Sequence, residues 1–146
     1  MMMNSTAAVA FLALFTCAAT AQTVPPSDFT TPEGAAFIHQ QLGDQLLAFK
    51  QEGAQDLIYF TTLLSWRCGV QELYYGFNDD LAVTRFPMEP CYRDLRQPNT
   101  NKEIGTIYPF FISVPTGSVA KVSLRVIYED GSTAKFLSER AKNLVY

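Results

Sequence analysis

The sequence predicts a mainly β protein with one N-terminal amphipathic helix, folded as a small antiparallel β-sandwich. Three observations support this fold class. A helix start at residues 31–33 is followed by an apolar stripe with helical spacing. Six segments rich in β-branched and aromatic residues come next, separated by turn residues. The last two of these segments flank an Asp-Gly pair, which is a strong signal for a tight hairpin.

The helix is expected to begin at Pro32. Thr31 supplies a capping hydroxyl, and Pro32 lacks the N–H that would be unpaired in the first turn. Apolar residues then recur at spacings of four, four and three, and these are Ile38, Leu42, Leu46 and Phe49. We therefore expect a helix of about five turns that ends near Gly53.

Six strands are expected after the helix. They are Leu57–Trp66, Val70–Phe77, Leu81–Phe86, Ile107–Val114, Ala120–Tyr128 and Ser132–Leu137. Asp130-Gly131 should form the turn that pairs the last two of them antiparallel. The tail, residues 139–146, is expected as a last strand or a frayed end.

The number of strands determines the expected architecture. Such a set of strands must close on itself as a sandwich or lay one face against the helix. We favour a sandwich that is immunoglobulin-like or fibronectin-like by strand count. The alternative is an α+β fold in which the helix packs on an antiparallel sheet. The antibody pattern is absent, because Trp66 precedes both Cys68 and Cys91 instead of lying between them.

The first 21 residues have the pattern of an export signal. An apolar run from Ala7 to Thr16 precedes Ala19 and Ala21, which form a small-residue cleavage site. This run is shorter than the roughly 20 apolar residues that a membrane anchor needs. A lipoprotein acylated at Cys17 is an open alternative, although Thr16 stands where lipoprotein signals carry Gly, Ala or Ser.

The chain is accordingly divided into three parts. Residues 1–21 are a signal peptide, residues 22–31 an extended N-terminal arm, and residues 32–146 a single domain. The protein is expected to be exported, to the periplasm or out of the cell. Its net charge of −3 lacks the basic character that nucleic-acid binding needs, so no nucleic-acid partner is expected.

Cys68 and Cys91 are expected to form one disulfide. They are the two cysteines that remain once the signal is removed, and exported proteins enter compartments in which disulfides persist. The two residues are 23 positions apart, and closing a loop of that size stabilises a fold by about 3 kcal/mol.

No residue cluster in the sequence defines a reaction. His39 falls off the apolar stripe and has no catalytic partner near it, so it is not expected to be catalytic. Two cysteines and one histidine are too few for a closed zinc site, and no cofactor or metal is expected. Five carboxylates could be brought together by the strands, and these are Glu72, Asp79, Asp80, Glu129 and Asp130. Most of them stand in positions where Asp is favoured because it forms turns. Calcium at residues 78–80 is a minor alternative.

Four residues are candidates for contact with a partner or ligand. Tyr74 and Tyr75 are adjacent on one predicted strand, so their side chains should point to opposite faces and one of them can be exposed. Arg93 and Arg96 lie in a predicted loop from Tyr92 to Thr106, whose length is unusual in a compact domain and typical of functional segments.

These observations lead to three functional hypotheses. The first is an exported, non-enzymatic binding or assembly module that engages another protein through a sheet edge or the loop at 92–106. The second is a domain that binds carbohydrate or cell-wall material through Tyr74 or Tyr75. The third is a small secreted hydrolase that uses carboxylates on its strands.

Overall fold

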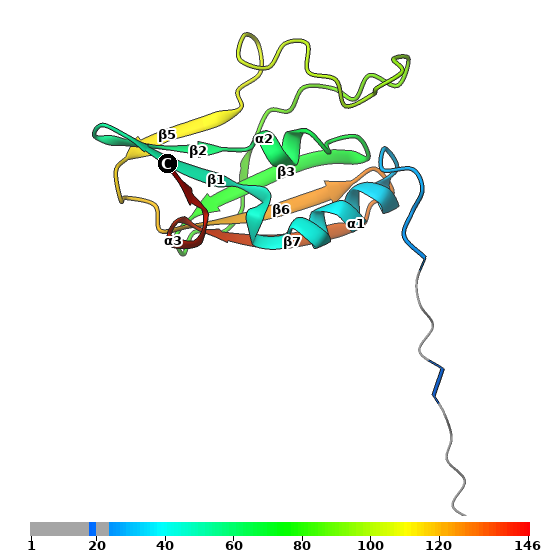
Figure 1. The fold of residues 1–146 in the computed structure, drawn as a ribbon, viewed down its shortest axis with the longest axis horizontal. Coiled ribbons are helices and arrows are strands. Elements are labelled where there is room, and N and C mark those ends of the chain that lie inside the picture. Colours follow the sequence, from blue (N-terminus) through cyan, green and yellow to red (C-terminus); the bar gives the residue numbers. More distant parts are fainter. Residues whose placement is uncertain (1–17, 20–23) are drawn as a thin grey trace, which may run out of the picture.

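The computed structural model describes residues 18–19 and 24–146 (Figure 1). The predicted signal peptide, apart from Ala18 and Ala19, and the lipidation alternative at Cys17 lie outside these ranges and stay predictions. No helix among the described residues combines the length and the apolar character needed to cross a membrane.

Two four-stranded sheets make up most of the described chain, and a few short helices accompany them. The first sheet has the order β5 (Phe111–Pro115), β2 (Gln55–Tyr59), β1 (Ala48–Glu52) and β8 (Leu144–Val145). The second sheet has the order β4 (Thr84–Arg85), β3 (Val70–Phe77), β6 (Lys121–Tyr128) and β7 (Thr133–Glu139). The helices are α1 (Pro32–Leu42), the 3₁₀ helix η1 (Gly43–Leu46), α2 (Thr61–Leu64) and α3 (Arg140–Asn143). Pairing is antiparallel except between β1 and β8, so the predicted mainly β, mostly antiparallel fold is confirmed.

The prediction of one five-turn helix ending near Gly53 is wrong, because α1 ends at Leu42. Gly43 takes a φ of 54°, a conformation that favours glycine, and its N–H donates to His39 O at the end of the helix. After η1 the chain continues as β1, and Gly53 is in the turn between β1 and β2. The apolar stripe therefore spans three kinds of element, with Leu46 buried in η1 and Phe49 buried in β1.

The start of α1 is as predicted, but its buried face is not. Thr31 Oγ1 accepts a hydrogen bond from Gly34 N at 3.1 Å, which confirms the cap. The helix turns Gly34, Ala35 and His39 into the protein, whereas Ile38 is only half-buried. Gly34 lies so close to the backbone of Asp28 and Phe29 that a Cβ at this position would collide with them.

The strand predictions are confirmed best around tight turns. β3 has the predicted bounds, and β6 and β7 pair antiparallel across Asp130-Gly131. Asp130 Oδ1 accepts hydrogen bonds from the backbone N–H and the hydroxyl of Ser132, and Gly131 takes a φ of 84°.

Three other strand predictions are only partly right. The predicted strand Leu57–Trp66 ends at Tyr59 and continues as α2, because a helical turn lets the consecutive Leu63 and Leu64 both face the core. The predicted strand Leu81–Phe86 is reduced to β4, and the predicted strand Ile107–Val114 begins only at Phe111, as β5. The tail, expected as a last strand or a frayed end, forms α3 and β8.

Residues from both sheets and α1 form one hydrophobic core. It includes Ala35 of α1, Phe49 of β1, Ile58 of β2, Leu73 of β3 and Leu124 of β6. Figure 1 shows α1 beside β6 and β7, and the connection from β4 to β5 passing over α2 and β3. That connection carries the candidate functional site.

Candidate functional site: a loop anchored by a disulfide and a buried arginine

The connection between β4 and β5, residues 86–110, contains no helix and no strand and is called the long loop below. It contains the predicted loop at 92–106. Within it the backbone forms short turns and one isolated bridge between Ile104 and Tyr108. Because the long loop contains no helix and no strand, few of its backbone groups pair within it, and its path depends on side chains from the rest of the protein.

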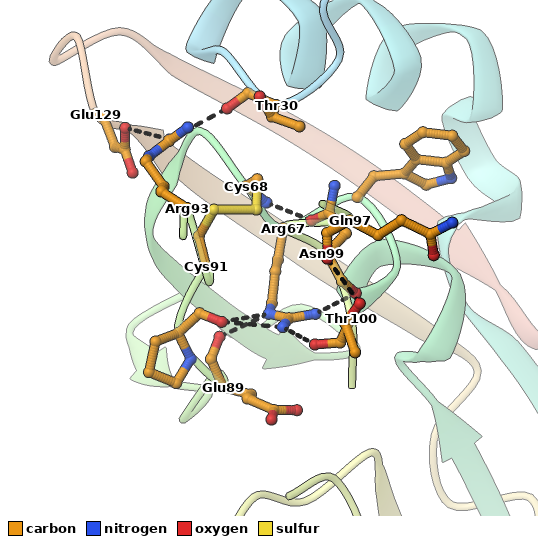
Figure 2. Close-up of a disulfide and its surroundings, with 12 residues drawn as sticks. Thr30, Arg67, Cys68, Glu89, Cys91, Arg93, Gln97, Asn99, Thr100 and Glu129 are labelled. Carbon is orange, nitrogen blue, oxygen red and sulfur yellow. Dashed lines mark hydrogen bonds and ion pairs between the residues drawn. A yellow bond between two sulfur atoms is a disulfide. The ribbon is translucent and has the colours of Figure 1, made fainter. Parts of the chain in front are cut away.

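The predicted disulfide between Cys68 and Cys91 is present, with the two Cα atoms 5.0 Å apart (Figure 2). Cys68 follows α2, and Cys91 is in the long loop. The backbone N–H of Cys68 also donates to Asn99 Oδ1 at 2.8 Å. The bridge and this hydrogen bond fasten two points of the long loop to the body of the protein.

Arg67 is the main anchor of the long loop, and its side chain is almost wholly buried, with 1% of the residue exposed. All three guanidinium nitrogens donate hydrogen bonds, and five of the six acceptor atoms belong to the long loop (Figure 2). The acceptors, with their distances, are Glu89 O (2.8 Å), Pro90 O (2.9 and 3.1 Å), Leu64 O (3.1 Å), Asn99 O (3.0 Å), Thr100 O (2.7 Å) and Asn101 Oδ1 (3.0 Å). The rigid fork of the guanidinium thus holds two separate stretches of the long loop together.

Glu89 supplies a second buried charge beside Arg67. Its Oε1 accepts hydrogen bonds from Tyr92 Oη (2.7 Å) and from the backbone N–H groups of Lys102 (2.7 Å) and Glu103 (2.8 Å). Burial opposes the ionised form, but these hydrogen bonds outweigh it, so the pKa of Glu89 lies below its ordinary value. In turn, the hydrogen bond to Glu89 raises the pKa of Tyr92 to about 12.

The other oxygen of this carboxylate, Glu89 Oε2, is buried without a hydrogen-bond partner among the described residues. Glu89 lines a cavity of about 110 Å³ that Glu72, Arg85 and Glu129 also line. One lone acceptor does not make a metal site, and the described part of the chain contains no group of three or more His, Cys, Asp or Glu side chains that could hold a metal ion.

Of the two predicted arginines, one ties the long loop to its surroundings and the other points outward. Arg93 Nη2 donates to Glu129 Oε2 at 3.0 Å and to Thr30 O at 3.1 Å, so it joins the long loop to the N-terminal arm and to the turn after β6. Arg96 is exposed on the long loop. Arg96 is therefore the better placed of the two for contact with a partner.

Tyr74 and Tyr75 point to opposite faces of the second sheet, as expected for neighbours on a strand. Tyr75 packs against Phe60, Phe77 and Phe86 on the core side. Tyr74 lies on the outer face, where the guanidinium of Arg125 stacks on its ring at 4.3 Å from the ring centroid. Tyr74 is thus the one of the pair that a carbohydrate-binding hypothesis could use.

His39 is in the core, not off the buried face as predicted. Because Trp66 O at 3.2 Å can only accept, His39 Nε2 carries the proton, and Nδ1 accepts from Tyr128 Oη at 2.9 Å. Burial lowers the pKa of His39 to about 4, which keeps the ring neutral at neutral pH. Its contacts are those of a structural residue.

Two of the candidate carboxylates, Glu72 and Glu129, line the same cavity as Glu89, whereas Asp79, Asp80 and Asp130 lie in turns outside it. Glu72 accepts from Tyr74 Oη at 2.7 Å, and Asp79 pairs with Lys121 at 2.9 Å. Glu129 pairs with Arg93, Asp130 holds its turn, and Asp80 is exposed. At residues 78–80, the minor alternative for calcium, the side chain of Asn78 is used in hydrogen bonds to Ser118 O and the N–H of Ala120.

Neither Arg67 nor Glu89 stands out in the amino-acid sequence as a site residue. The only local signal is their position, because Arg67 precedes one bridged cysteine and Glu89 stands two residues before the other. An arginine beside a disulfide cysteine is normally exposed, so its burial depends on the path of the long loop, which the sequence pattern does not reveal.

No protein-family model, no curated protein and no solved structure matches this chain.

Proposed function

We propose that this protein is an exported, non-enzymatic binding module that engages another protein through residues 92–106 of the long loop and the adjoining edge of β5. The observation that carries the proposal is the use of Arg67. A buried cation is costly unless its surroundings satisfy it fully. Here the acceptors that satisfy buried Arg67 belong mostly to one surface loop, so Arg67 fixes the conformation of that loop. A fixed conformation is typical of loops that present side chains to a partner.

The edge of β5 supports the same surface. β5 is the end strand of the first sheet and pairs only with β2 among the described strands. Ile107 and Phe111, at the junction of the long loop and β5, are exposed large apolar residues. An unpaired strand edge beside exposed apolar side chains is suited to a partner that adds a strand and fills the neighbouring surface.

The proposal includes export and a sandwich architecture. The apolar run at 7–16, with its small-residue site, supports a signal peptide at 1–21, and the disulfide supports an oxidising compartment. Two four-stranded sheets with a shared core support a sandwich that is immunoglobulin-like or fibronectin-like by strand count.

Site-specific photo-crosslinking tests the proposed surface. A benzophenone side chain is placed at position 96 or 107, and the purified protein is irradiated at micromolar concentration in an envelope or culture-supernatant fraction. We expect both positions to give an adduct with the same protein, and an excess of unlabelled protein to abolish that adduct.

The matched control carries the same benzophenone at position 142, because Lys142 is exposed on α3, outside the proposed surface. We expect no such adduct from position 142. An identical adduct from that position, or no adduct from positions 96 and 107, would contradict the proposal.

A further inference from the structure

A second surface feature lies away from the long loop, on the face of the second sheet that is turned away from the core. It is a groove of about 780 Å³ between β6, β7 and the segment that follows β3, and it is called the outer groove below. Its volume is within the range of roughly 300–1,000 Å³ that small-molecule sites occupy.

The wall of the outer groove is the segment 78–83, which the fold holds in a fixed position. Asn78 takes a φ of 54° and bonds the chain before β6, with Nδ2 donating to Ser118 O at 3.0 Å and Oδ1 accepting from Ala120 N at 2.9 Å. The backbone of the wall lies so close to Gly76 that a Cβ at this position would collide with Leu81 O.

Large apolar side chains line the outer groove and remain exposed. Leu81 is 79% exposed, Val83 68% and Leu137 44%, and all three line the groove. Burying such side chains is favourable because it removes apolar surface from water. An occupant with an apolar body would therefore be stabilised by covering them.

Two cations stand side by side in the outer groove, whose wall also carries the carboxylates of Asp79 and Asp80. Arg125 of β6 is directly opposite Lys135 of β7, and both line the outer groove. Like charges that are directly opposite across two strands destabilise a sheet. Neither side chain forms an ion pair with the residues that the structure describes, although Lys121 nearby pairs with Asp79.

The remaining contacts of Arg125 orient it without neutralising it. Its guanidinium stacks on the ring of Tyr74, and Nε donates to Ala82 O at 3.3 Å. Both partners are uncharged. On a chain of net charge −3, an uncompensated pair of cations beside an apolar groove is complementary to an anion with an apolar body.

We propose that the outer groove binds a long-chain carboxylate, such as a free fatty acid. The carboxylate lies between Arg125 and Lys135 and removes their mutual repulsion. The alkyl chain covers Leu81, Val83 and Leu137. This site is independent of the protein-binding surface on the long loop.

Binding of dodecanoate to the purified protein tests the proposal, with calorimetry below the concentration at which dodecanoate forms micelles. Dodecan-1-ol is the matched probe, because it has the same alkyl chain and no charge. We expect dodecanoate to bind at least about tenfold more tightly than dodecan-1-ol, and its affinity to fall as salt is added.

The variants separate the two halves of the site. Lys135→Gln should weaken dodecanoate about fivefold and leave dodecan-1-ol unchanged, whereas Leu137→Ser should weaken both. Lys142→Gln, which removes a cation outside the groove, should change neither affinity. Equal binding of the two probes, no measurable binding of dodecanoate, or a Lys142→Gln effect as large as that of Lys135→Gln would overturn the proposal.

A measurement without ligand tests the repulsion itself. Lys135→Glu places an anion opposite Arg125 and should raise the midpoint of thermal unfolding while abolishing the preference for dodecanoate over dodecan-1-ol. An unchanged preference in this variant would likewise overturn the proposal.

Discussion

The side chains of Arg67 and Arg140 are both largely removed from solvent, but they differ in the kind of hydrogen-bond acceptor that surrounds them. Arg67 donates only to neutral oxygens, and most of these belong to one surface loop. Arg140, at the start of α3, donates two hydrogen bonds to the buried carboxylate of Asp56 on β2. Nε is 2.7 Å from Oδ2, and Nη2 is 3.0 Å from Oδ1. A carboxylate ties two points of the fold together, whereas a set of carbonyls defines the path of a whole segment.

The largest effect is expected from Arg67→Met. This change leaves several loop carbonyls unpaired and the buried charge of Glu89 without its neighbouring cation, so the free energy of unfolding should fall by about 3–5 kcal/mol. Chemical denaturation measures the loss. Trypsin, which cuts after Arg93, Arg96 and Lys102, should cleave the long loop of the folded variant faster than that of the parent protein.

Arg67→Lys is the control for charge. It keeps a cation but lacks the fork that reaches both stretches of the long loop, so its loss should be intermediate. If Arg67→Met unfolds at the same denaturant concentration as the parent and resists trypsin equally well, the long loop does not depend on Arg67.

His39 extends the comparison to a buried base that is kept neutral. Its pKa falls from about 6.5 in the unfolded chain to about 4 in the fold, so only the unfolded chain takes up a proton between these values. The free energy of unfolding is therefore independent of His39 above about pH 6.5 and falls as the pH drops toward 4. The expected loss is about 2 kcal/mol by pH 5 and about 3 kcal/mol in total.

Denaturation midpoints at several pH values between 7 and 5 measure this effect, in a range where carboxylates contribute little. His39→Gln can still hydrogen-bond but cannot titrate, so its free energy of unfolding should be nearly constant over the same range. A parent protein as insensitive to pH as His39→Gln would show that His39 is not desolvated in the fold.

Elements built from neighbouring residues are the ones that the sequence predicts well. The Thr31 cap follows from a capping residue, β3 from a run of β-branched and aromatic residues, and the hairpin at Asp130-Gly131 from its turn residues. The Cys68–Cys91 disulfide joins residues 23 positions apart and follows instead from the number of cysteines and the expected export. The error in α1 has a local cause as well. Gly43 is a stop signal, but an apolar stripe that continues past it suggests a longer helix.

The anchored site could not be predicted, because its contacts join residues far apart in the chain. Arg67 reaches Asn99, Thr100 and Asn101, which are more than 30 positions away, and no periodicity links them. The burial of His39 likewise depends on Tyr128, 89 positions later. The pattern of neighbouring residues shows which face of a helix is apolar, but it does not show that His39 has buried hydrogen-bond partners in Tyr128 and Trp66.

The smallest of these effects is expected from Asp56→Asn, which tests the other half of the comparison. The hydrogen bond from Arg140 lowers the pKa of Asp56, so the ionised carboxylate stabilises the fold above its ordinary pKa near 3.8, and this contribution is lost as the pH falls through the lowered value. The variant should lose about 1.5 kcal/mol at neutral pH, less than Arg67→Met, because the side chain of Arg140 keeps some contact with water.

Arg140→Gln, alone and combined with Asp56→Asn, completes a double-mutant cycle for the pair. Cleavage of the long loop by trypsin should stay at the parent rate in all three variants, since the side-chain hydrogen bonds of Asp56 and Arg140 join β2 to α3, Gln51 and Gly117, all of which lie outside the long loop. Faster cleavage in Asp56→Asn would mean that the two arginines stabilise one cooperative unit instead of two separate regions.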